Sequence, residues 1–82
     1  MEQYSTEEMN FCGNVKRLRE HLQLSKDDMA KLCGVNALGI RGIEHGCLSS
    51  YLVLKISAGI YTNLHIPPSA MISEDVLRYR GE

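Results

Sequence analysis

Apolar residues recur at helical spacing along most of this chain. Two long sets follow one another at intervals of three or four residues, as they do on one face of a helix. These sets are Phe11, Val15, Leu18 and Leu22, and Val53, Ile56, Ile60 and Leu64. No segment alternates β-branched and polar residues as a strand would. The pattern therefore predicts an all-α fold.

Two shorter helices are predicted between the long ones. Ser25 is typical of a helix cap, and Asp28, three residues later, could return the bond as in a capping box. Gly34 ends this helix, because glycine readily adopts the left-handed conformation of helix ends. Asn36 is a second good cap, and it begins a helix predicted over residues 37–44.

The last part of the chain predicts a fifth helix and a final turn. Pro67 and Pro68 suit the first turn of a short helix that runs through Ile72. Together the elements predict a compact five-helix bundle. We divide it into a flexible N-terminal arm (1–10), a helix-turn-helix domain (11–72, with the helix-turn-helix proper at 25–45) and a C-terminal tail or short helix (73–82).

The composition excludes several functional classes. Three cysteines, at positions 12, 33 and 47, include no C-x-x-C pair, which indicates reduced thiols in the cytoplasm rather than disulfides or a zinc site. The histidines show no metal-ligand spacing. The acidic start and the lack of an apolar run of about 20 residues argue against a signal peptide and a membrane span. No catalytic arrangement is visible, so we expect no enzyme, cofactor or metal.

Charge is distributed unevenly along the chain. The 82 residues carry a net charge of −1, whereas nucleic-acid-binding domains are usually basic. Residues 16–55, however, hold seven basic and four acidic side chains and so carry +3, while both ends are acidic. The predicted helix-turn-helix is therefore weakly basic, and we expect weak non-specific DNA binding.

The turn between the two short helices bears most directly on function. It consists of Cys33-Gly34-Val35, and its central glycine fixes the two helices at a steep angle. Such a corner can project its second helix into the major groove of DNA. Other small bundles also contain tight helical corners, so the turn alone leaves the function open.

The residues around the turn match a longer pattern in fixed register. The matching segments are Val15 to Glu20, Leu24 to Ala30, Cys33 to Asn36, Ile40, and Ile43 to Gly46. This pattern resembles the phage-repressor or Cro-like (XRE-type) helix-turn-helix family. That family has an Ile/Val-x-x-Leu-Arg start, a Leu-Ser-Gln-x-x-Leu-Ala second helix, a Gly-Val-Ser turn and an Ile-Ser-x-Ile/Trp-Glu-x-Gly ending. The resemblance covers residues 13–46 well and residues 47–72 loosely.

The resemblance implies one structural ion pair and several phosphate contacts. Arg19 and Glu44 would pair and tie the first helix to the third; two unrelated surface charges are the alternative. Lys26 stands where the family has a DNA-contacting glutamine, and its ammonium could reach a phosphate oxygen or remain solvated. Lys16 or Arg17 would face further phosphates.

The positions that read base edges in the family are Ala37, Leu38, Arg41 and Gly42 here. Alanine, leucine and glycine cannot form bidentate hydrogen bonds with bases, although Ala37 or Leu38 could touch a thymine methyl group. Arg41 is the only strong donor, able to bind a guanine or a phosphate; pairing with a neighbouring acid is the alternative.

Two glycines weaken the predicted helix over residues 37–44. Gly39 and Gly42 each cost about 1 kcal/mol relative to alanine. Either they let the backbone approach DNA or the second helix closely, or the helix no longer reads bases. The sequence leaves both explanations open.

We therefore expect a sequence-specific DNA-binding transcriptional regulator, most simply a repressor. It would bind double-stranded DNA as a homodimer and insert residues 37–44 into the major groove. Late apolar residues either form the dimer surface or cap the core: Met71, Ile72, Val76, Leu77 and Tyr79. The alternative is a protein-interaction module, antitoxin-like or anti-repressor, which keeps the fold without reading DNA.

Overall fold

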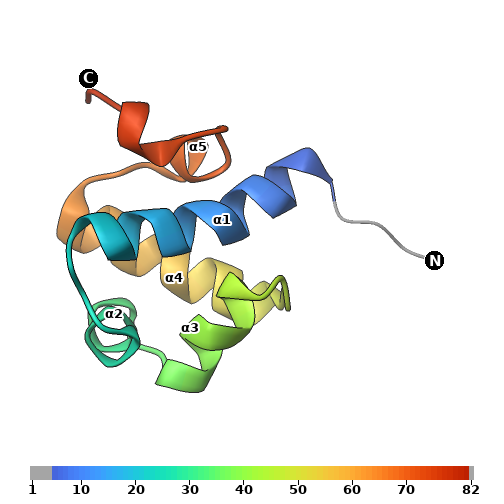
Figure 1. Cartoon of the computed structure of the whole chain (residues 1–82), viewed down its shortest axis with the longest axis vertical. Coiled ribbons are helices and arrows are strands. Elements are labelled where there is room, and N and C mark those ends of the chain that lie inside the picture. The colour runs from blue at the N-terminus through green and yellow to red at the C-terminus, as the bar shows by residue number, and fades with distance from the viewer. Residues whose placement is uncertain (1–4, 82) are drawn as a thin grey trace.

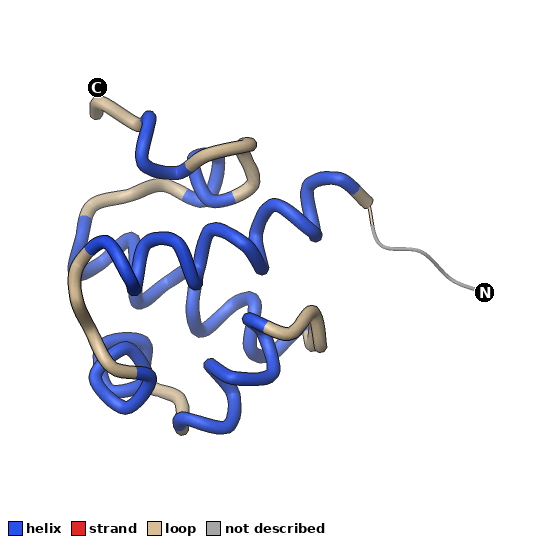
Figure 2. The backbone as a smooth tube through the Cα atoms, in the orientation of Figure 1, coloured by secondary structure: helices blue, strands red, loops and turns tan. Residues whose placement is uncertain are grey.

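The computed structural model describes residues 5–81, and within this range the chain is helical without strands (Figure 2). The elements are α1 (Thr6–His21), α2 (Lys26–Cys33), α3 (Ala37–Glu44), α4 (Ser50–Leu64), α5 (Pro68–Met71) and the 3₁₀ turn η1 (Val76–Arg78). In Figure 1, α2 and α3 lie on one side of α1, and α5 and η1 lie on the other. The expected all-α, five-helix bundle is confirmed. No helix in the described range is long and apolar enough to cross a membrane.

Each of the five helices contributes a fully buried side chain to one core. These residues are Val15, Met29, Ile40, Ile56 and Met71. The two apolar sets seen in the sequence supply much of this core. Leu22 departs from the pattern, because it is the C-cap of α1 and is 39% exposed.

The first helix begins earlier than its apolar stripe predicts. Ser5 caps α1, and its Oγ accepts a hydrogen bond from the Glu8 backbone N–H at 3.1 Å. The Glu8 carboxylate accepts in return from the Ser5 N–H at 2.7 Å. This full capping box starts the helix where no side chain is buried, so the proposed arm at 1–10 is wrong from Ser5 onward. Residues 1–4 lie outside the described residues.

A buried asparagine joins the C-terminal segment to α1. The Asn14 side chain is fully buried, and its amide donates to the carbonyls of Met71 at 2.8 Å and Ser73 at 2.7 Å. Its Oδ1 accepts from the Val76 N–H at 3.0 Å. Because Val76 itself lies in the core, the domain extends beyond the boundary predicted at residue 72.

Helices α2 and α4 cross at very short range. A Cβ placed on Gly59 would lie 2.6 Å from the Cα of Cys33, so only glycine permits this approach. Cys33 is buried, as the sequence suggested for a small apolar side chain, and its Sγ lies 3.9 Å from the Ile56 carbonyl oxygen. This crossing places α4 behind the corner that α2 forms with α3.

Candidate nucleic-acid interface

The corner between α2 and α3 is fixed by caps on both sides of its turn. Ser25 Oγ accepts from the Asp28 N–H at 3.0 Å, although the side chain of Asp28 forms no return bond of the kind a capping box has. Gly34 ends α2 at a φ of 71°. Asn36 Oδ1 then accepts from the Gly39 N–H at 2.8 Å and begins α3. The turn predicted from the sequence is therefore present.

The inner face of α3 is held by apolar packing and by one ion pair. Ile40 and Ile43 are fully buried. Arg19 donates from Nε to one Glu44 oxygen at 2.6 Å and from Nη2 to the other at 3.1 Å. Arg19 also donates to the Leu24 carbonyl at 3.0 Å, and the bond to Glu44 raises the pKa of the guanidinium. The ion pair implied by the resemblance is thus formed, and it ties α1 to the end of α3.

The outer face of α3 presents two projecting side chains. Leu38 is 74% exposed, and Arg41 is exposed as well. The side chain of Arg41 forms no hydrogen bond or ion pair with any described residue, which leaves its five donors available. Ala37 and Gly42, the other two residues expected to face bases, are half-buried. The face therefore offers one guanidinium and one isobutyl group.

Of the two glycines of α3, only Gly39 is explained by packing, and its close neighbour is on α4 rather than α2. A Cβ on Gly39 would lie 2.9 Å from Leu52 Cδ2, on α4. A Cβ on Gly42 would lie 3.7 Å from the Cβ of Cys47, which is ordinary van der Waals contact. Gly39 thus makes room for α4, whereas nothing in the described structure requires glycine at position 42.

The three residues expected to face phosphates are divided between two sides of the molecule. Lys26 is the first residue of α2 and is half-buried, and Lys16 is exposed on α1. Arg17 instead donates to Asn14 Oδ1 and to the Glu74 carbonyl, with Nε 3.9 Å from an Asp75 carboxylate oxygen. Its partners lie on α1 and in the C-terminal segment, across α1 from α2 and α3 (Figure 1).

One cation beside the corner was not assigned a role from the sequence. Lys55 projects from α4 so that its Nζ would lie 3.5 Å from a Cβ on Gly34. Its ammonium therefore lies at the C-terminal end of α2, where a helix dipole favours a positive charge. Sequence reasoning counted Lys55 among the basic residues but did not place it at the corner. Its position there depends on how α4 crosses α2, which no local pattern shows.

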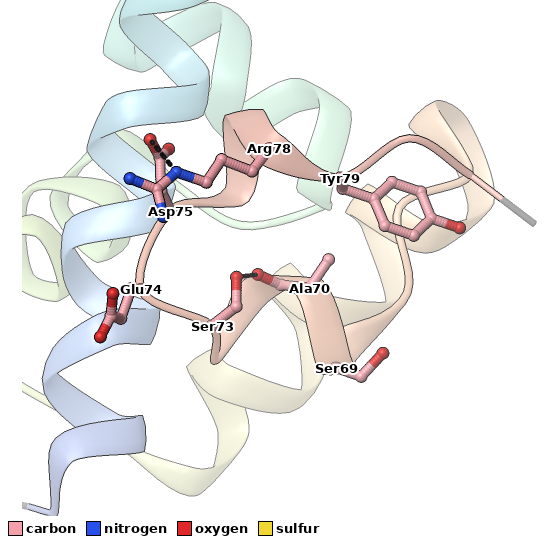
Figure 3. A pocket seen from close by; sticks show the side chains of 7 residues that line it. All are labelled: Ser69, Ala70, Ser73, Glu74, Asp75, Arg78 and Tyr79. Carbon is pink, nitrogen blue, oxygen red and sulfur yellow. Dashed lines mark hydrogen bonds and ion pairs between the residues drawn. The ribbon is translucent and has the colours of Figure 1, made fainter.

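Several residues that line a hollow beside α5 and η1 pair with one another. Figure 3 shows Ser73, Asp75 and Arg78 around it, with the Ser73 hydroxyl donating to the Ala70 carbonyl at 2.6 Å. Arg78 Nε lies 3.9 Å from an Asp75 carboxylate oxygen. These bonds serve to shape the C-terminal segment.

The late apolar residues divide between the core and the surface. Met71 and Val76 are buried, Leu77 and Tyr79 pack against the core, and only Ile72 of this set is exposed, at 42%. Of the two alternatives left open for these residues, capping of the core is the one that holds for Met71 and Val76. Ile72 lines an apolar groove of about 710 Å³, together with residues of α1 and α4 that include Phe11, Val53 and Leu54.

Comparison with known proteins does not identify a relative of this chain. No family model, curated protein or solved structure matches this chain. Among the described residues, no group of three or more His, Cys, Asp or Glu side chains is placed to hold a metal ion.

Proposed function

We propose that the protein is a sequence-specific DNA-binding regulator of transcription, acting in the cytoplasm. The observation that carries this proposal is the outer face of α3, where Leu38 and Arg41 project from a helix whose opposite face is fixed by Ile40 and Ile43. A rigid, exposed helix after a three-residue turn has the geometry that enters a major groove. The Cro-like pattern around the turn supports the same interpretation.

Cations on three elements near this corner support phosphate binding. Lys26 begins α2, Arg41 projects from α3, and Lys55 lies beside the turn. Phosphate contacts position a protein on the duplex without reading its sequence. Arg19 is committed to Glu44, so the available positive charge is modest. We therefore expect binding that weakens steeply as salt concentration rises.

We further propose that two copies bind together. One helix of eight residues contacts few base pairs, and two copies on half-sites about one helical turn apart multiply the discrimination. The apolar groove that Leu54 and Ile72 line is the surface we assign to the second copy, because both side chains are exposed there. Occupation of a promoter by such a dimer would repress transcription.

A selection from random double-stranded DNA tests the proposal. The full chain is incubated with the library at low salt, and retained duplexes are sequenced. We expect a defined motif, and we expect Arg41→Ala to weaken binding to it by roughly tenfold or more, since a bidentate contact with guanine contributes about 1–3 kcal/mol. Arg80→Ala, an exposed arginine of the C-terminal segment, is the matched control and should bind normally.

Failure to retain any duplex at low salt would overturn the proposal. The same chain would then fit the interaction-module hypothesis, in which the fold serves to bind another protein. Light scattering on the free protein measures its oligomeric state separately. If the groove is the dimer surface, Leu54→Glu should yield monomers.

A further inference from the structure

Leu38 is the most exposed of the large apolar side chains in the described structure, at 74%. A single exposed leucine is ordinary on a protein surface, so its exposure alone carries no function. Its position is more informative. Leu38 is the second residue of α3, and Arg41 follows three residues later on the same helical face. The leucine therefore lies on the face that we propose enters the major groove.

Polar readout is largely absent from the rest of this face. Ala37 and Gly42 carry no donor, and the side-chain position at Gly39 is occupied by Leu52. Asn36 uses its Oδ1 to accept from the Gly39 N–H, so this oxygen is already engaged and only the Nδ2 group remains for a base, which disfavours the bidentate contact that adenine recognition requires. Apart from Arg41 and the cap residue Asn36, the side chains on the exposed face of α3 offer DNA only hydrocarbon.

The major groove contains one hydrocarbon feature, the C5-methyl group of thymine, and 5-methylcytosine carries the same group at the same position. We propose that Leu38 reads a pyrimidine C5-methyl group. This inference rests on the proposed function and names the class of base that the site selects. Discrimination comes from burying the methyl group against the leucine, so a pyrimidine without it is bound less tightly.

The position of Arg41 relative to Leu38 limits how far from the methyl group a guanine bound by Arg41 can lie. Side chains three residues apart on a helix have Cβ atoms about 5–6 Å apart. Successive nucleotides of a strand lie about 3.4 Å apart along the duplex. Because the arginine side chain extends well beyond its Cβ, the guanine that Arg41 would bind lies within a few base pairs of the methylated pyrimidine.

The test uses the duplex obtained by selection, with single thymines replaced by uracil. Uracil keeps every hydrogen-bonding group of thymine and lacks only the methyl group. At the position that Leu38 reads, we expect the dissociation constant to rise about fourfold, the value for one buried methyl-sized group. Replacing that thymine by cytosine and by 5-methylcytosine separates the two sources of the methyl group.

The variant Leu38→Ala shows which side chain is responsible. Alanine favours the helix and position 38 is exposed, so the variant should fold normally. In Leu38→Ala the fourfold effect of uracil should disappear, whereas Leu22→Ala, an exposed leucine at the end of α1 and outside the proposed dimer groove, should retain it. If the protein binds its duplex and uracil has the same effect in both variants, the methyl readout is wrong and the proposed function stands. If no duplex is bound, both fail.

Discussion

Arg19 and Glu44 form a two-pronged ion pair that closes the first helix onto the last residue of the third. Nε–Oε2 and Nη2–Oε1 distances are 2.6 and 3.1 Å, and the two side chains are 13% and 4% exposed. An ion pair so little exposed to water gains little by itself, because desolvation offsets the attraction. Breaking it is costly, since one charge is then left buried.

Removal of the arginine should therefore destabilise the fold. We expect Arg19→Ala to lower the free energy of unfolding by about 3–5 kcal/mol, because Glu44 keeps its buried charge without a partner. Urea denaturation followed by circular dichroism measures this loss. Replacing both partners by Met and Leu should restore much of it. A loss below about 1 kcal/mol for Arg19→Ala would show that water solvates Glu44 in the folded protein.

Two glycines with opposite surroundings provide a matched pair. Gly59→Ala should destabilise by about 1–3 kcal/mol or more, because its Cβ would meet the Cα of Cys33 at 2.6 Å and neither backbone can turn away. Gly13→Ala should instead stabilise by about 0.5–1 kcal/mol, since a Cβ there meets nothing within 4 Å inside α1. Thermal melts of both variants should shift in opposite directions. A shared direction would contradict the close crossing of α2 and α4.

The buried asparagine should control attachment of the C-terminal segment. Asn14→Ala removes the partners of the Met71 and Ser73 carbonyls and of the Val76 N–H. Each buried polar group left unpaired costs about 1–3 kcal/mol. We expect the Val76 amide to exchange with deuterium much faster, and limited proteolysis to cut within residues 72–78. Asn63→Ala, which loses an exposed amide on α4, is the control and should leave this exchange unchanged.

Thiol reactivity should separate the three cysteines. Burial raises the pKa of the Cys33 thiol to about 11 and also raises that of Cys12, whereas Cys47 is exposed. Thiolates are the reactive form, so at pH 8 a thiol reagent should modify Cys47 quickly and the other two only after addition of urea. Mass spectrometry of the labelled peptides measures each rate. Three equal rates in native buffer would contradict the burial.

The raised pKa of Cys33 also predicts that the free energy of unfolding falls at alkaline pH. Between an unfolded value near 9 and the folded value of about 11, the unfolded chain loses the Cys33 proton that the folded chain keeps. This contribution to stability is complete below pH 9 and declines as pH rises to 11. Cys33→Ala should therefore lose less stability over this interval than the unmodified chain does, as urea titrations at pH 8 and pH 10.5 would show.

Much of the fold could be predicted from the sequence, because apolar spacing and capping residues act locally. The turn at Gly34 and the caps at Ser25 and Asn36 are of this kind. The burial of Asn14 could not be predicted, since a polar residue within a helix is expected to face solvent unless a distant segment covers it. The early start of α1 was missed for the opposite reason, because the Ser5 cap begins a helix before any residue is buried.

The proposed interface was predictable only in part. Leu38 and Arg41 lie exposed where the resemblance placed them, because the register of a short helix follows from its cap and its two buried isoleucines. Arg17 and Lys55 could not be placed in this way. Their positions depend on how the C-terminal segment and α4 pack against earlier helices, and no local pattern encodes that packing.

The amide of Asn14 has a consequence for how the protein is made. Its partners Met71 and Val76 follow it by 57 and 62 residues. A ribosome adding about 5–20 residues per second therefore finishes α1 several seconds before these partners exist. Through that interval the polar atoms of the asparagine side chain have only water or other transient partners. The nascent chain can complete the hydrogen bonds of Asn14 only after Val76 has left the exit tunnel, so the attachment of the C-terminal segment to α1 is among the last contacts that the fold can form.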